Sequence, residues 1–128
     1  MSRYGRVYFN RQHQWISLRT GYVGITKWAL EDEVMAQRHW CKFFPFKDKV
    51  YAEAGEQIGV VLVKSSDRWY TSIHAPYDGI ITHTNTKVFS NQRRLVSEYL
   101  FRITPTNNRP VDLLTYHDYM SWVLSLNN

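Results

Sequence analysis

The sequence has little cysteine and no long apolar run, and each shortage excludes a class of protein. A single cysteine, Cys41, among 128 residues excludes an internal disulfide and fits a reducing compartment. No apolar stretch approaches the roughly 18–20 residues that cross a bilayer. The segment 1–15 also lacks the apolar core of a secretory signal. We therefore expect a protein without a membrane segment, located in the cytoplasm, with the mitochondrial matrix as the alternative.

The sequence also lacks glycine-rich linkers and blocks of like charge. It has only six glycines and four prolines, and no run of five or more basic residues. Its 44% hydrophobic and 16% aromatic content is enough to bury a core, so we expect one domain over 1–128. Sixteen Lys and Arg against 11 Asp and Glu give a net charge of +5. A basic balance fits an acidic protein partner, or more weakly a nucleic acid.

Alternating apolar and polar residues predict a mainly β fold. Several short alternating runs are separated by glycine turns, which is typical of a small β-sandwich or flattened barrel. A short helix is expected over 27–36, capped by Thr26. Apolar residues at helical spacing predict a second helix from Val111 to the C-terminus. The expected strands cover 6–9, 14–18, the end of 19–26, 39–44, a short segment near 51, 58–65, 69–75, 80–84 and 98–103.

The longest pair of alternating runs predicts a β-hairpin. Its arms are expected at 58–65 and 69–75, with the tip around Ser66, Asp67 and Arg68. Ser66 and Asp67 are residue types that begin turns. Arg68 and Trp69 place a guanidinium beside an indole at this tip, a combination that is common in protein–protein contacts. The sequence thus predicts that residues 66–69 contact a partner, although exposure to solvent alone would also explain them.

Catalytic and metal-binding patterns are not found. Five histidines invite a metal site, and His39, Cys41 and His83 are the best set, but their spacing matches no zinc motif. Cys41 lies among aromatic residues and is expected to be a buried, unreactive thiol. No nucleophile motif or phosphate-binding glycine loop is present. We therefore expect neither a metal site nor an enzyme.

Five segments follow one another in an order that is characteristic as a set. They are "HQW" (13–15), "YVGIT" (22–26), "EAGEQIGVV" (53–61), "APYDGIITHTN" (75–85) and "LLTYHDYM" (113–120). On these segments the chain resembles the H protein of the glycine cleavage system, a relative of the lipoyl domains. The resemblance implies a lipoyl/biotinyl-type β-sandwich whose hairpin presents a lysine for lipoate. It also implies a carrier that performs no chemistry of its own.

The sequence departs from this family at the attachment point. The family's lysine stands about six residues after the glycine of "GVV" and seven before "AP". Here Lys64 lies five after Gly59 and eleven before Ala75, whereas Arg68 lies seven before Ala75. Arginine stays protonated and cannot be acylated. The family is typically acidic and often has Glu where this chain has Gln14.

Two hypotheses follow from these departures. The preferred one is an H-protein-like domain with a degenerate lipoyl hairpin, acting as a non-catalytic binding or scaffold module for another macromolecule. It needs no cofactor. The alternative is a divergent carrier, lipoylated on Lys64, that shuttles an aminomethyl or related group between enzymes. In the preferred hypothesis Lys64 is an ordinary solvated lysine at the end of a strand.

Overall fold

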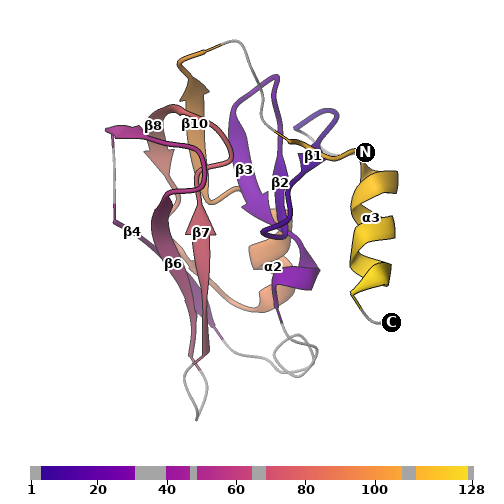
Figure 1. The fold of residues 1–128 in the computed structure, drawn as a ribbon. Helices are drawn as coiled ribbons and strands as arrows, with labels where there is room; N and C mark the ends of the chain where they lie inside the picture. The colour runs from indigo at the N-terminus through magenta and orange to yellow at the C-terminus, as the bar shows by residue number, and fades with distance from the viewer. Residues whose placement is uncertain (1–3, 31–39, 47–48, 65–68, 108–111, 127–128) are drawn as a thin grey trace.

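The chain forms two antiparallel sheets packed face to face (Figure 1). The computed structural model describes residues 4–30, 40–46, 49–64, 69–107 and 112–126, and for Trp69 the backbone only. Within these ranges one sheet, called sheet A, has six strands in the order β1-β2-β3-β10-β8-β5, and sheet B has four in the order β7-β6-β4-β9. Sheet A consists of β1 (Tyr8–Phe9), β2 (Gln14–Ile16), β3 (Tyr22–Ile25), β5 (Tyr51–Ala52), β8 (Gly79–Thr84) and β10 (Phe101–Pro105). Sheet B consists of β4 (Cys41–Pro45), β6 (Gln57–Val63), β7 (Trp69–His74) and β9 (Val88–Phe89).

The main core lies between the two sheets. Phe43 and Val61 from sheet B and Ile81 and Ile103 from sheet A are all fully buried. The Phe43 ring packs toward Phe101 at a centroid distance of 6.4 Å. Inward and outward residues alternate along β4, as expected for a sheet with one buried face. The prediction of a mainly β sandwich is confirmed, with two open sheets rather than a closed barrel.

The N-terminal helix prediction is confirmed at its start. Lys27–Ala29 form a 3₁₀ helix, η1, and the Thr26 side chain caps it by accepting a hydrogen bond from the Trp28 N–H at 3.2 Å. Helix η1 ends there, because Leu30 is its C-cap and has an extended backbone, so the prediction of one continuous helix over 27–36 is wrong at Leu30. The remaining part of the expected helix, 31–36, lies outside the described residues.

The C-terminal helix is present but begins later than predicted. Helix α3 spans Tyr116–Ser125, because the Thr115 hydroxyl accepts from the Asp118 N–H and so caps a helix that starts at 116. It packs on the outer side of β1 and β2 (Figure 1). The Phe9 and Tyr119 rings stack there at 4.8 Å between centroids. This second apolar cluster consists of Tyr4, Phe9, Trp15, Tyr119 and Val123.

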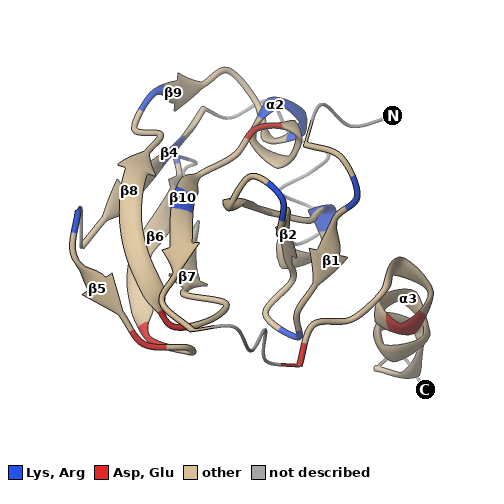
Figure 2. Ribbon diagram, turned by 90° about the horizontal axis from the view of Figure 1, so that it is seen from above, with Lys and Arg blue, Asp and Glu red and all other residues tan. Residues whose placement is uncertain are grey.

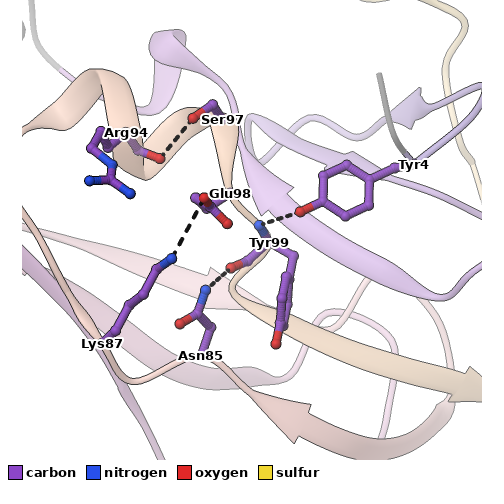
Figure 3. A network of polar contacts seen from close by, with 7 residues as sticks. All are labelled: Tyr4, Asn85, Lys87, Arg94, Ser97, Glu98 and Tyr99. Carbon is purple, nitrogen blue, oxygen red and sulfur yellow. Dashed lines mark hydrogen bonds and ion pairs between the residues drawn. The ribbon is translucent and has the colours of Figure 1, made fainter. Parts of the chain in front are cut away.

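A short helix that the sequence did not predict precedes the last strand. Residues 98–103 were expected to form one strand, but β10 begins at Phe101, and α2 occupies Gln92–Ser97. Figure 3 shows how the segment after α2 is held: Asn85 donates to the Tyr99 carbonyl at 2.8 Å, and the Tyr99 N–H donates to the Tyr4 hydroxyl at 3.3 Å. These bonds satisfy backbone groups outside the sheet ladder. The prediction of a continuous strand there is therefore wrong at residues 98–100.

Candidate functional site

The β6–β7 hairpin is the longest hairpin among the described strands, and its register is regular from the pair Gly59–Ile73 to the pair Val63–Trp69. Val63 pairs with Trp69, Leu62 with Tyr70 and Val61 with Thr71. The paired strands reach beyond the ends of β2 and β3 in Figure 1. The predicted hairpin is thus present, and the segment 64–68 connects its last residue pair.

Lys64 lies at the base of this connection. It is exposed and directly follows Val63, the last residue of β6. Its N–H donates to the Trp40 carbonyl at 3.0 Å, which continues the pairing of β4 with β6 by one residue. Its ammonium nitrogen lies 5.2 Å from the centre of the Trp40 ring. A lysine over an indole at an exposed site gains about 0.5–1 kcal/mol. Both its backbone and its side chain therefore contact Trp40, the residue directly before β4.

The predicted contact residues of the tip are described only in part. Ser66, Asp67 and Arg68 lie outside the described residues, as does the side chain of Trp69. The backbone of Trp69 is the first residue of β7 and pairs with Val63. A partner contact through this tip stays a prediction.

The other end of the hairpin is held by a buried glutamine. Gln14 of β2 is fully buried, and its amide nitrogen donates to the His74 carbonyl at 2.7 Å. Its amide oxygen accepts from the His74 N–H at 3.0 Å. One amide thus satisfies both backbone groups of the last residue of β7 and links sheet A to sheet B. Burial lowers the pKa of the His74 imidazole from its usual value.

A polar contact joins the segment "HQW" to the C-terminal helix. The Tyr119 hydroxyl lies 2.8 Å from His13 Nδ1 and 2.8 Å from the Thr26 hydroxyl. Burial raises the pKa of Tyr119 to about 12, and it lowers the pKa of the His13 imidazole. His13 has a φ of 58°, so its backbone adopts the left-handed conformation. The cluster orients α3, and we assign it a structural role.

An open cavity of about 390 Å³ lies near the Gln14–His74 contact. Asn10 contributes to its wall, and the Asn10 side-chain oxygen accepts from the Gln12 and Gln14 N–H groups at 3.0 and 3.1 Å. The cavity lies at the end of β7 opposite to Lys64, a strand length of about 17 Å at the usual rise per residue. Sequence reasoning did not identify this cavity. It is lined by 10–12, 54–55, 75–76 and Asp112.

The residues considered for metal binding and nucleophilic chemistry do not form a site in the described part of the chain. No group of three or more His, Cys, Asp or Glu residues within those ranges could hold a metal ion, and His39 lies outside them. Cys41 is fully buried, and burial raises the pKa of its thiol to about 11. A thiol with such a pKa is almost entirely protonated at neutral pH and is a poor nucleophile.

The fold is similar to that of an H protein. A glycine cleavage system H protein from Mycobacterium marinum superposes with a TM-score of 0.64 and 22% sequence identity, covering 93% of this chain and 97% of that chain. No protein-family model matches the sequence, and no curated protein matches it. The chain therefore has an H-protein-like, lipoyl-type fold. Among the helices of the described ranges, none has the length and apolar character needed to span a bilayer.

Proposed function

We propose that this chain is a non-catalytic binding module with an H-protein-like fold, and that its hairpin contacts another protein without carrying lipoate. The position of Lys64 carries this proposal. A lipoyl arm needs an anchor that projects from the apex of a tight turn, whereas Lys64 directly follows a strand and is bonded to Trp40. Its place at the base of the connection supports the loss of the carrier function.

Two further features support a binding role. The Cys41 thiol is not an activated nucleophile, since burial raises its pKa to about 11. The net charge of +5 also reverses the sign typical of the proteins that the chain resembles. Because long-range steering depends on the field of the whole protein, a basic module is suited to acidic partners. Binding to nucleic acid rests on this charge alone and is the weaker explanation.

A divergent carrier is the second candidate. The observation in its favour is that Lys64 is exposed at the tip end of the hairpin, where a ligase could reach its amine. In this case Lys64 would carry lipoate and shuttle an aminomethyl or related group between enzymes.

Intact-mass measurement distinguishes the two candidates. The purified chain is incubated with a lipoate ligase, ATP and lipoate, beside an H protein as the positive control. We expect no mass increase for this chain. An adduct that disappears in Lys64→Arg and persists in Lys42→Arg would establish the carrier and refute the binding-module proposal. Lys42 is a suitable control because it also lies over an aromatic ring, at 5.2 Å from the Phe44 centroid.

The contact through the hairpin tip requires a separate experiment. Partners recovered by the wild-type chain from its native extract are compared with those recovered by an Arg68→Ala/Trp69→Ala variant. A Lys27→Ala/Trp28→Ala variant is the matched control, because it removes an adjacent basic–aromatic pair from η1. We expect partners to be lost only in the hairpin variant. Equal recovery by all three chains would refute the tip contact.

A further inference from the structure

The outward side of sheet B, which faces away from the core, forms a continuous surface that we call the outer face. Tyr70, Leu62, Lys42 and Val88 are direct neighbours in one row across all four strands. Cross-strand neighbours project to the same side of a sheet, and so do residues two apart on one strand. Phe44 and Trp40 therefore share this side with Lys42. The outer face comprises Trp40, Lys42, Phe44, Val60, Leu62, Tyr70, Ser72 and Val88.

The outer face is unusually apolar for a surface open to solvent. Tyr70 is 65% exposed, Val88 55%, Phe44 38% and Trp40 36%. The residues that alternate with them along β4 and β6 point to the other side of the sheet and fill the core. Helix α3 lies on sheet A, away from this side of the molecule (Figure 1). Contiguous exposed apolar side chains of this kind are typical of surfaces that bind another protein.

Charge on the outer face has a single sign. The described strands β4, β6, β7 and β9 contain no aspartate or glutamate. Lys42 lies on the outer face itself, and Lys64 lies at its edge over Trp40. Figure 2 shows acidic residues in loops and helices around the sandwich. Within the described ranges, no carboxylate is paired with either of these two lysines.

We infer that the outer face is a docking surface for a protein whose apolar contact patch is rimmed by carboxylates. The aromatic and aliphatic side chains would bury against the apolar patch, and Lys42 and Lys64 would face the carboxylates. A second copy of this chain does not supply that charge, since two outer faces would bring lysines against lysines. Single-stranded nucleic acid would stack on the aromatic rings but would leave Leu62 and Val88 without apolar partners. The inference rests on the proposed binding function and names its partner chemistry.

A titration with defined probes tests this surface. The ¹⁵N-labelled full chain is titrated with a synthetic amphipathic helical peptide whose leucine stripe is flanked by glutamates. A peptide with lysines in place of the glutamates and a thymidine oligonucleotide are the comparison probes. We expect amide shifts on β4, β6 and β7 with the acidic peptide alone, and weaker binding at higher salt. Tyr70→Ala should weaken binding about tenfold, as for an exposed aromatic anchor.

Matched variants separate the surface from general effects. Tyr116→Ala removes a tyrosine that is 63% exposed on α3, and Lys27→Glu reverses a lysine that also lies over an indole, so neither should change binding. Lys42→Glu should abolish the preference for the acidic peptide. Equal binding of both peptides, stronger binding of the oligonucleotide, or no shifts on sheet B would overturn the inference. The hairpin-tip contact and the absence of lipoylation would be unaffected by such a result, since they are measured separately.

Discussion

Replacing Gln14 by glutamate tests whether the buried amide joins the two sheets. The wild-type amide donates to the His74 carbonyl at 2.7 Å and accepts from the His74 N–H at 3.0 Å. A carboxylate can still accept, but it cannot donate to the carbonyl. Gln14→Glu therefore loses one hydrogen bond worth about 1 kcal/mol and leaves the partly buried His74 carbonyl without this donor, which costs about 1–3 kcal/mol. The cost of burying the new carboxylate, or of protonating it, adds to this penalty. We therefore expect the free energy of unfolding at pH 7 to be about 3 kcal/mol lower than that of wild type.

The pH dependence of Gln14→Glu follows from the state of the new acid. Protonated, the carboxyl can donate to the His74 carbonyl in place of the amide, so the folded state favours the neutral form and the folded pKa is raised. A raised folded pKa means that the variant is most stable below the unfolded value, about 4.3 for glutamate, and loses stability as pH rises. The free energy of unfolding of Gln14→Glu should be about 1 kcal/mol below that of wild type near pH 4. This difference should grow by at most about 1.4 kcal/mol for each pH unit above pH 4.

Urea unfolding of both chains from pH 4 to pH 8 measures this difference, and the histidine titrations common to both largely cancel. Gln57→Glu is the matched control, because Gln57 is exposed and its amide donates to the Ser72 hydroxyl at 3.1 Å. That control should change the free energy of unfolding by less than about 0.5 kcal/mol at any pH. A Gln14→Glu deficit that is small at pH 7, or that stays constant with pH, would refute the role assigned to Gln14.

Three further outcomes are expected. Phe43→Ala should lower the free energy of unfolding by about 3–5 kcal/mol and Phe44→Ala by less than about 1 kcal/mol, because Phe43 is fully buried and Phe44 is 38% exposed; similar losses for both in urea unfolding would contradict the sandwich register. Burial lowers the pKa of His13, so the contribution of neutral His13 to the free energy of unfolding is complete above pH 6.5 and is lost as pH falls through the lowered folded pKa. His13→Asn, whose side chain suits the positive φ, should therefore lose less free energy of unfolding between pH 8 and pH 5 than wild type does in the same urea experiment. Cys41 should resist a thiol-specific disulfide reagent in the native state and react at once in urea, and rapid native reaction would show that the thiol is accessible.

The sheets could be predicted from the sequence where periodicity was strong. The two arms of the β6–β7 hairpin alternate over six or seven residues, and the structure pairs them within two residues of the predicted bounds. Periodicity fails for short elements. Helix α2 has six residues, of which only Gln92 and Leu95 are buried, so its pattern is too short to distinguish from a strand. Its cap, Asn91, was the available indication.

The start of α3 illustrates a different limit. Apolar residues at helical spacing begin before Tyr116, because Leu114 packs beside the second apolar cluster without being helical. Leu114 instead exchanges backbone hydrogen bonds with Phe9 at 2.8 and 2.6 Å, which extends sheet A by one bridge. A pattern of apolar residues indicates which side chains face the core. It does not indicate whether their backbone groups form hydrogen bonds within a helix or with another strand. The capping residue Thr115 was the better indicator of the helix start.

From the sequence, the loss of the lipoyl-attachment lysine could be predicted only by counting residues from Gly59 and Ala75 to the hairpin tip. The structure gives the physical reason why these distances along the chain matter. The pairs of β6 and β7 are in continuous register from Gly59–Ile73 to Val63–Trp69, so a change of length in either arm moves every later residue relative to the tip. A sandwich core accepts many apolar combinations at its buried positions. A carrier lysine, by contrast, needs one residue at one place in the turn. The fold can therefore persist where carrier chemistry is absent, and the proposed docking surface, which includes Leu62 and Tyr70 of the hairpin itself, would not depend on a lysine at the tip.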